Sequence, residues 1–146
     1  MGDQVEIIVR GVLIHAGKLM VCRNRKHGHI FLPGGHVDFN EPASQALQRE
    51  CVEELGVALA VGEFLGACEA AFDQVKSKGV SRHHEINLVF QLVIPAGFDP
   101  QSLRSQEEHI AFDWLAVTQL ADVKLLPMGI EQLIVRGAKW ISAFDS

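Results

Sequence analysis

Apolar and polar positions along the chain follow the pattern of strands more often than that of helices. The first apolar stretch, residues 5–25, is rich in β-branched side chains and is interrupted only at Ala16-Gly17-Lys18. A tight turn at this interruption predicts a hairpin of two strands, Val5–His15 and Leu19–Arg25. Further apolar stretches predict strands at Ile30–Leu32, Ala58–Phe72, Glu85–Ile94 and His109–Ala116. Polar stretches between them predict loops at Lys26–His29 and Ala96–Gln106, and a mobile loop at Asp73–Arg82.

Helical spacing of apolar residues occurs in two places. Residues 43–55 carry the first helix, and Gly56 is placed to end it. Pro42 fits the first helical position, and either Asn40 or Glu41 fits the cap before it. The second helix is predicted at the end of the chain, over Met128–Ala138, and a turn or short helix is predicted at Val117–Ala121.

Strands therefore outnumber helices, and hairpins alternate with single helices. This organisation predicts a mixed sheet with helices packed against it, an α/β or α+β domain. A length of 146 residues fits a single domain, 1–146, and a hydrophobic content of 48% is enough for a buried core.

Charge, hydropathy and cysteine content exclude several classes of protein. The net charge is −5 without a dense Lys/Arg stripe, which argues against binding to extended nucleic acid. No apolar run approaches the roughly 20 residues of a membrane helix, and the acidic N-terminus does not resemble a secretion signal. Cys22, Cys51 and Cys68 are far apart and form no CxxC pair. We therefore expect reduced thiols in a cytoplasmic protein with neither a structural zinc site nor a membrane partner.

Three acidic residues crowd the second half of the first predicted helix. Because each helical residue advances by about 100°, Glu50, Glu53 and Glu54 share one face. Like charges at these spacings repel one another, and the helix dipole disfavours anions at this end. An ordinary solvated face is one interpretation. The other is a divalent cation such as Mg²⁺, which takes carboxylates and substrate phosphates as ligands.

The residues around the three acids favour the cation. Gly34-Gly35 lets the backbone come close to a ligand, and the guanidinium group of Arg49 can hold a carboxylate. A bound cation would also supply the positive charge that a phosphorylated substrate needs in a chain of negative net charge.

The spacing of these residues resembles the Nudix box, G-x5-E-x7-R-E-U-x-E-E-x-G-U. Every fixed position of the box is filled between Gly35 and Val57, by Gly35, Glu41, Arg49, Glu50, Glu53, Glu54 and Gly56. Cys51 is the one departure, since a larger aliphatic residue is usual there, and it affects packing only. The strand pattern on both sides of the box is similar to the family over nearly the whole chain.

The resemblance implies a Nudix fold, an α/β/α sandwich with a loop-helix-loop catalytic element. It also implies hydrolysis of a small nucleotide-type substrate, a nucleoside diphosphate linked to another moiety, with Mg²⁺ or Mn²⁺. By position in the box, Glu53 and Glu54 would bind the metal together with the carbonyl group of Gly34. Glu50 would be a further ligand or the base that deprotonates the attacking water. Many members of the family are homodimers, and the strand pattern leaves the oligomeric state open.

Other roles follow from the same resemblance. Arg49 would orient a glutamate, Glu41 would hold the loop to the helix, and Gly56 would end the helix. A substrate contact is expected from Gly35. Independently of the resemblance, Arg23 and Arg25 leave the second predicted strand toward the glycine pair, which fits either contact with substrate phosphates or a surface role.

Some Nudix enzymes use an additional acid from outside the box. We favour Glu108 for this role over Glu107 and Glu85. His83-His84 lacks further histidines at metal spacing, so a solvated or supporting role is expected for the pair. Aromatic residues at strand spacing fit the core better than base stacking, and these are Phe72, Phe90, Phe112 and Trp114.

Several substrate classes within the family are compatible with the sequence. The chain has no tyrosine, and tyrosines mark the enzymes that act on dinucleotide polyphosphates. A nucleoside triphosphate and a nucleotide sugar of the ADP-ribose type remain. The alternative is a noncatalytic nucleotide-binding regulatory domain, although such domains usually lose box glutamates and all four are present here.

Overall fold

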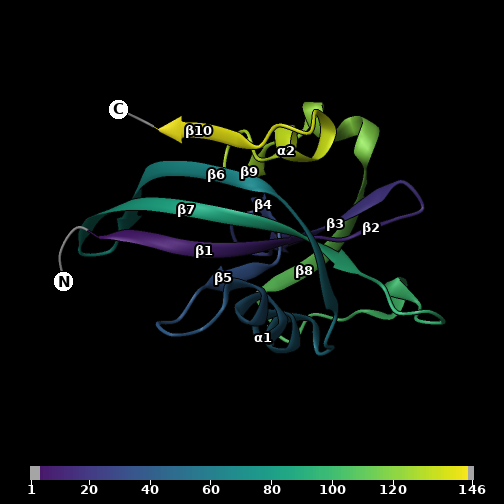
Figure 1. The fold of residues 1–146 in the computed structure, drawn as a ribbon. Coiled ribbons are helices and arrows are strands. Elements are labelled where there is room, and N and C mark those ends of the chain that lie inside the picture. Colours follow the sequence, from purple (N-terminus) through teal and green to yellow (C-terminus); the bar gives the residue numbers. More distant parts are fainter. Residues whose placement is uncertain (1–3, 145–146) are drawn as a thin grey trace.

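Two mixed β-sheets lie between two α-helices in the structure, a computed structural model that describes residues 4–144 apart from the side chain of Gln101 (Figure 1). The strands are β1 (Val5–Val12), β2 (Ile14–His15), β3 (Lys18–Asn24), β4 (Ile30–Phe31), β5 (Gly34–His36), β6 (Ala60–Lys76), β7 (Gly79–Val93), β8 (Ile110–Ala116), β9 (Leu125–Leu126) and β10 (Trp140–Phe144). The helices are α1 (Ala43–Leu55) and α2 (Glu131–Val135), with 3₁₀ turns η1 (Pro100–Ser102) and η2 (Val117–Asp122).

The first sheet carries the elements that form the candidate site. Its strand order is β10-β6-β7-β1-β5. β1 runs parallel to β7 and β10 runs parallel to β6, whereas the β6–β7 and β1–β5 pairs are antiparallel. The second sheet has the order β2-β3-β4-β9, with β8 paired to β3. β1 therefore lies between the strand of the glycine pair and the long β6–β7 hairpin.

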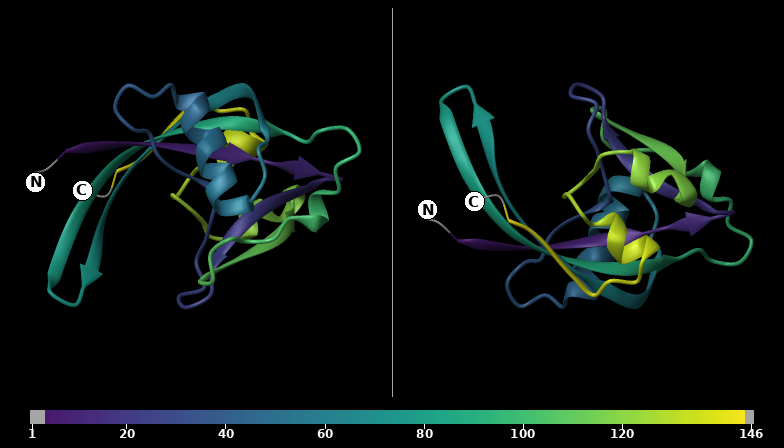
Figure 2. Two further views of the ribbon diagram at one scale, coloured as in Figure 1. Left: turned by 90° about the horizontal axis from the view of Figure 1, so that it is seen from below. Right: turned by 90° about the horizontal axis from the view of Figure 1, so that it is seen from above.

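The two helices lie on opposite sides of the sheets (Figures 1 and 2). α1 buries its apolar face against β1 and β3, with Leu47 and Cys51 packed in one cluster with Val9 and Met20. α2 packs in a second cluster, where Leu133 joins side chains from both sheets. Helical spacing of apolar residues thus produced α1 as predicted, because its buried stripe faces the sheets. Within residues 4–144, no helix has both the length and the apolar character to cross a membrane.

The first predicted hairpin differs from the observed strands. Residues of the predicted strand Val5–His15 divide between β1 in the first sheet and β2 in the second. The turn itself is where it was expected, since Ala16 and Gly17 have positive φ values of 52° and 76° and join β2 to β3. The apolar run Val5–His15 therefore supplies one strand to each sheet. The periodicity of apolar residues does not reveal this division.

The prediction of a loop at Asp73–Arg82 is wrong. β6 and β7 remain paired as far as Lys76 and Gly79, so the segment is the tip of a long hairpin (Figure 2). Figure 2 shows this hairpin curving away from the body of the molecule. Its side chains are mostly exposed, so the tip lacks the apolar alternation that marks a half-buried strand.

Three further boundaries needed correction. The terminal helix is only Glu131–Val135, and the chain then forms β10, which was not predicted. At the start of α1, neither Asn40 nor Glu41 makes a side-chain cap, because Pro42 is the residue before the helix. Gly34 and Gly35 belong to the short strand β5, which was not predicted.

Candidate active site

Gly34 determines where the backbone meets the glutamates of α1. The pairing of β5 with β1 sets Gly34 opposite Arg10. Its φ is +151°, and a Cβ atom at this position would lie 1.9 Å from the carbonyl oxygen of Val9. Only glycine fits this close approach. The Gly34 N–H donates a hydrogen bond to Oε1 of Glu54 at 3.0 Å.

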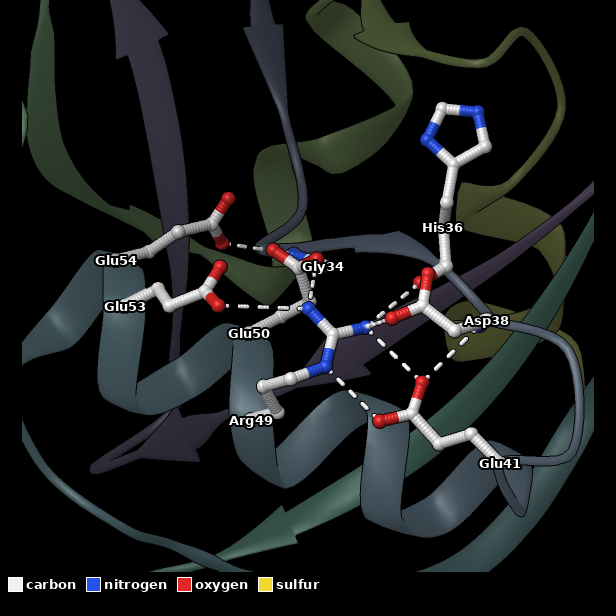
Figure 3. A network of polar contacts seen from close by, with 8 residues as sticks. All are labelled: Gly34, His36, Asp38, Glu41, Arg49, Glu50, Glu53 and Glu54. Atoms are coloured by element: carbon white, nitrogen blue, oxygen red, sulfur yellow. Dashed lines mark hydrogen bonds and ion pairs between the residues drawn. The ribbon is translucent and has the colours of Figure 1, made fainter.

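Gly35 leaves room for the carboxyl group of Glu50. A Cβ atom on Gly35 would lie 2.4 Å from Cδ of Glu50 and 2.5 Å from its Oε1. Because Glu50 and Glu54 lie one turn apart on α1, both reach the glycine pair from the same side (Figure 3). The two glycines therefore bring backbone and carboxylate oxygens into one small space.

Arg49 ties the loop before α1 to the helix through its guanidinium group (Figure 3). Nε and Nη2 donate to the two carboxylate oxygens of Glu41 at 2.9 and 3.0 Å, a bidentate pair. Nη1 donates to Oε1 of Glu50 at 3.0 Å, and Nη2 also donates to the carbonyl oxygen of His36. The hydrogen bonds from Arg49 hold the pKa of Glu41 below its usual range. Arg49 is thus in position to orient Glu50, and Glu41 to anchor the loop.

The three acidic residues of the helix face differ in environment. Burial raises the pKa of Glu54 to about 7, although the hydrogen bond from Gly34 acts in the opposite direction. Burial also raises the pKa of Glu50, and the hydrogen bond from Arg49 opposes it. The Glu53 side chain is 57% exposed and lies 3.5 Å from Nη1 of Arg49. The carboxyl groups of Glu50 and Glu54 are therefore held where a nearby positive charge would stabilise their ionised form.

The oxygen donors at this site suit a small, hard cation. Mg²⁺ in proteins takes one or two carboxylates, with waters and substrate phosphates as its other ligands. Glu50 and Glu54 supply two carboxylates beside the backbone of the glycine pair. Among residues 4–144, no three Asp, Glu, His or Cys side chains lie close enough to enclose one ion. The donor set is thus an open one that a phosphorylated substrate can complete.

The loop before β8 adds a further carboxyl group beside α1. The backbone N–H of Gln106 donates to the carbonyl oxygen of Glu54 at 3.0 Å, which fastens this loop to the end of the helix. A cavity of about 140 Å³ lies there, and Glu54, Glu107 and Phe31 are among its lining residues. Glu108 is exposed and does not line this cavity. The geometry therefore favours Glu107 as the acid outside the box, whereas the sequence pattern favoured Glu108.

The two arginines expected to contact substrate lie outside this small cavity. Arg23 pairs with the carboxylate of Asp113 and donates to the carbonyl oxygen of Gly28. It lines a separate cavity of about 570 Å³ together with Lys124. Arg25 is exposed. Substrate contacts from Arg23 and Arg25 stay a prediction.

The histidine pair and most of the aromatic residues have structural partners. His83 and His84 form hydrogen bonds with Glu6 and Glu69, at 2.9 and 2.8 Å, which agrees with a supporting role. The aromatic residues packed against the core are Phe90, Phe112 and Trp114. Phe72 does not belong to the core, because 41% of it is exposed and it stacks on His83.

Sequence reasoning overlooked Arg10, which lies between the glutamates and a second cavity. Its Nε donates to Oδ1 of Asn87 at 3.2 Å, and its Nη1 donates to the carbonyl oxygen of Leu32 at 2.9 Å. Burial lowers the pKa of Arg10, and the charges of Glu85 and Glu54 oppose that shift. One charged residue inside the apolar run VEIIVRGVLI is the signal that could have identified it.

The cavity that Arg10 lines has a volume of about 450 Å³. Its lining comes from six strands, β1, β4, β6, β7, β9 and β10, from His29 before β4 and from the segment after β9. It includes Arg10, Phe31, Phe72, Glu85 and Met128. Phe31 lines both this cavity and the one beside Glu54, so the two are adjacent. A ligand held near the glutamates therefore has space beside it for a bulky group.

Comparisons with known proteins agree with this arrangement. The sequence pattern of the NUDIX domain matches residues 6–134. The chain is 29% identical over 107 residues to the "Low-salt glycan biosynthesis protein Agl8" of Haloferax volcanii, covering 72% of this chain and 64% of that protein. It is 28% identical over 131 residues to the "Putative 8-oxo-dGTP diphosphatase 2" of Mycobacterium tuberculosis, covering 84% and 81% of the two chains. The solved structure of a MutT protein from Methanosarcina mazei Go1 matches with a TM-score of 0.71 and 20% identity, over 94% of this chain and 95% of that one.

The chain therefore belongs to the Nudix family, because the family pattern covers most of its length. The structural likeness confirms the predicted Nudix-type α/β/α sandwich with mixed sheets. Every fixed residue of the box is present, and Nudix hydrolases generally use divalent metal ions. It spans slightly less than two thirds of the Haloferax volcanii relative, at 64%.

Proposed function

We propose that this protein hydrolyses a pyrophosphate bond in a nucleotide substrate and requires Mg²⁺ or Mn²⁺. The observation that carries this proposal is the convergence of two partly buried carboxyl groups, Glu50 and Glu54, on Gly34 and Gly35. The ion would be held by these two carboxylates and by the backbone of Gly34, and the exposed side chain of Glu53 would join them by turning toward the ion. When bound, it neutralises phosphate charge and lowers the pKa of the attacking water.

The side chains around the ion position the water and accept its proton. The hydrogen bond from Arg49 engages Oε1 of Glu50, and Oε2 of Glu50 is left for the site. A carboxylate within reach of the water can accept its proton. The oxygen of the water bonds to phosphorus, its proton passes to a carboxylate, and the bond from phosphorus to the bridging oxygen breaks.

A nucleoside triphosphate is the substrate class that we favour. The relative from Mycobacterium tuberculosis is named as a diphosphatase of an oxidised deoxyguanosine triphosphate. The cavity of about 450 Å³ beside the glutamates is in the usual size range of small-ligand pockets and has room for a nucleoside. Arg23, Arg25 and Gly35 are proposed to contact the phosphates.

A nucleotide sugar of the ADP-ribose type is the second candidate. The cavity of about 570 Å³ shares His29 and Leu126 with the cavity of about 450 Å³. It carries Arg23 and Lys124, which suit a second charged half of such a substrate. A noncatalytic regulatory domain is the alternative from another class, and the complete set of box glutamates argues against it.

The decisive experiment is a substrate panel assayed with Mg²⁺, with Mn²⁺ and with EDTA, and with products identified by mass. Nucleoside triphosphates should give a monophosphate and pyrophosphate, whereas ADP-ribose should give two monophosphates. No metal-dependent product from any member of the panel would exclude the enzymatic function.

A double variant, Glu53→Gln with Glu54→Gln, provides the control for a contaminating hydrolase. It should lose most of the activity while circular dichroism and thermal unfolding report a retained fold. Binding of a nucleotide with unchanged affinity, in the absence of any turnover by the unmodified protein, would support the regulatory alternative instead.

A further inference from the structure

Glu85 lines the cavity of about 450 Å³, and its carboxylate has no hydrogen-bond partner among the residues that the structure describes. It lies on β7, paired with Glu6 of β1 and with Ala70 of β6, in the middle of the first sheet. None of the hydrogen bonds and ion pairs within residues 4–144 involves its carboxylate. Within the described residues, every fully buried side-chain oxygen has a partner. The Glu85 oxygens therefore remain accessible in the cavity that the residue lines.

Arg10 places hydrogen-bond donors in the same cavity. Its Nε and Nη1 are engaged by Asn87 and by the carbonyl group of Leu32, and none of its hydrogen bonds involves Nη2. The charge of Glu85 is the largest electrostatic influence that opposes the lowered pKa of Arg10, so the two groups act on each other. The wall of the cavity thus combines an acceptor and a donor within an otherwise largely apolar lining.

The rest of the lining suits a flat aromatic ring. Phe31 and Phe72 contribute aromatic side chains, and Pro127, Met128 and two alanines of β6 complete an apolar wall. Phe72 is half-exposed beside the cavity, not buried in the core. Aromatic and apolar walls with a few polar groups are the usual means of binding a planar ligand in a fixed orientation.

We infer that Glu85, supported by Arg10, selects nucleotides whose base presents two adjacent N–H donors beside a carbonyl acceptor, the pattern of guanine. This inference rests on the proposed function. A carboxylate accepts two parallel hydrogen bonds, here from N1–H and the 2-amino group, and the guanidinium group donates to O6. Hypoxanthine lacks the 2-amino group, and thymine offers a single N–H between two carbonyl groups.

The role of Glu85 is separate from that of the acids near the metal site. Glu107 lines the cavity beside Glu54, whereas Glu85 lines the larger cavity on the other side of Phe31. Glu85 therefore acts on the choice of base, and its replacement should change discrimination between substrates more than the rate of the chemical step.

The test compares dGTP with dITP, which differ only in the 2-amino group. For the unmodified protein, kcat/KM for dGTP should exceed that for dITP by roughly tenfold, the size of effect that one well-placed hydrogen bond to a base can have. Glu85→Gln should lower kcat/KM for dGTP by a similar factor and change that for dITP much less, so that the ratio approaches one. Glu85→Asp should keep part of the preference.

A matched control uses a carboxylate on the neighbouring strand. Glu69 of β6 is hydrogen-bonded to His84 and Ser142, and it does not line the cavity. Glu69→Gln should leave the dGTP to dITP ratio unchanged. Equal losses for both nucleotides in Glu85→Gln, or a ratio near one in the unmodified protein, would overturn the inference.

Binding measurements separate this inference from the proposed function. Calorimetric titration with dGMP and with dIMP measures binding affinity and requires no turnover. If no member of the substrate panel is hydrolysed, the proposed function fails, and the inference is still judged by whether dGMP binds roughly tenfold more tightly than dIMP and loses that advantage in Glu85→Gln. Tighter binding of dTMP than of dGMP would also contradict it.

Discussion

The two ends of the site are built in different ways, although Phe31 lines a cavity at each end. The glutamate end comes mostly from one stretch of chain, residues 34–57, with one loop added before β8. The end around Glu85 combines side chains from six strands and from the segment after β9. Arg10 and Asn87, which meet there, are 77 positions apart in the sequence.

This difference separates two tasks. At the glutamate end, Arg49 and the glycines hold the carboxylates in place through contacts between near neighbours, so that end should govern the rate of hydrolysis. At the other end, the neighbouring strands β1 and β7 supply Arg10 and Glu85 to the wall of one largely apolar cavity, and that end should govern the choice of substrate. Changes confined to one end test whether the division holds.

The largest expected effect follows the replacement of Glu54 by Gln. An amide is a poor ligand for a divalent cation and a poor proton acceptor. We therefore expect kcat to fall by roughly 10³-fold, within the range of losses for a residue that takes part in the chemistry. The ratio of kcat/KM for dGTP to that for dITP should stay the same. Steady-state kinetics on both nucleotides measure this effect, and a changed ratio would show that the two ends are not independent.

The same difference explains what the sequence could predict. The glutamate end was predicted almost completely, because the spacing from Gly35 to Gly56 encodes the loop, the helix face and the glycine contacts within one short stretch. The acid outside the box stays a prediction, because the sequence pattern favoured Glu108 whereas Glu107 lines the cavity beside Glu54. Either of two adjacent loop acids matched the pattern, and the hydrogen bond from Gln106 to Glu54 decides which of them lines the cavity.

The arrangement of residues around Glu85 could not be predicted from the sequence in the same way. Arg10 lies within an apolar strand, and its role depends on a parallel pairing with β7 that no local pattern encodes. The continuation of β6 and β7 beyond residue 72 was also missed, since an exposed two-stranded tip buries no face and shows no alternation. Long-range register, and not residue type, carries this information.

The second prediction concerns the stability of the metal-free protein. Burial raises the pKa of Glu54 to about 7 from an ordinary value of 4.5. Between these values the folded protein keeps a proton that the unfolded chain has released, so the free energy of unfolding falls as pH rises from 4.5 to about 7. The loss amounts to about 3 kcal/mol, at about 1.4 kcal/mol for each pH unit.

Urea unfolding in EDTA at several pH values measures this loss. Glu54→Gln should be more stable than the unmodified protein at pH 8 and about equally stable near pH 4.5. Addition of Mg²⁺ at pH 8 should stabilise the unmodified protein and act much less on the variant. Parallel pH profiles for the two proteins would show that Glu54 is not the group responsible.

The third prediction tests the loop anchor. Arg49→Lys keeps the positive charge but loses the planar fork that holds both oxygens of Glu41 and one oxygen of Glu50. Because residues that orient metal ligands typically contribute 10–100-fold, kcat should fall by roughly that factor. Glu41→Gln should cause a smaller loss, since Glu41 holds only the loop. A loss in Arg49→Lys confined to KM would contradict an orienting role.

The smallest expected effect distinguishes two neighbouring acids. Glu107 lines the cavity beside Glu54, and Glu108 is exposed. Glu107→Gln should lower kcat by roughly tenfold, in the lower part of the range for a group that assists proton transfer, whereas Glu108→Gln should stay within about twofold of the unmodified protein. Since both variants remove one negative charge from the same loop, general electrostatic effects cancel in the comparison. A larger loss in Glu108→Gln would mean that the loop rearranges when substrate binds, and the glutamate end would then depend on more than residues 34–57.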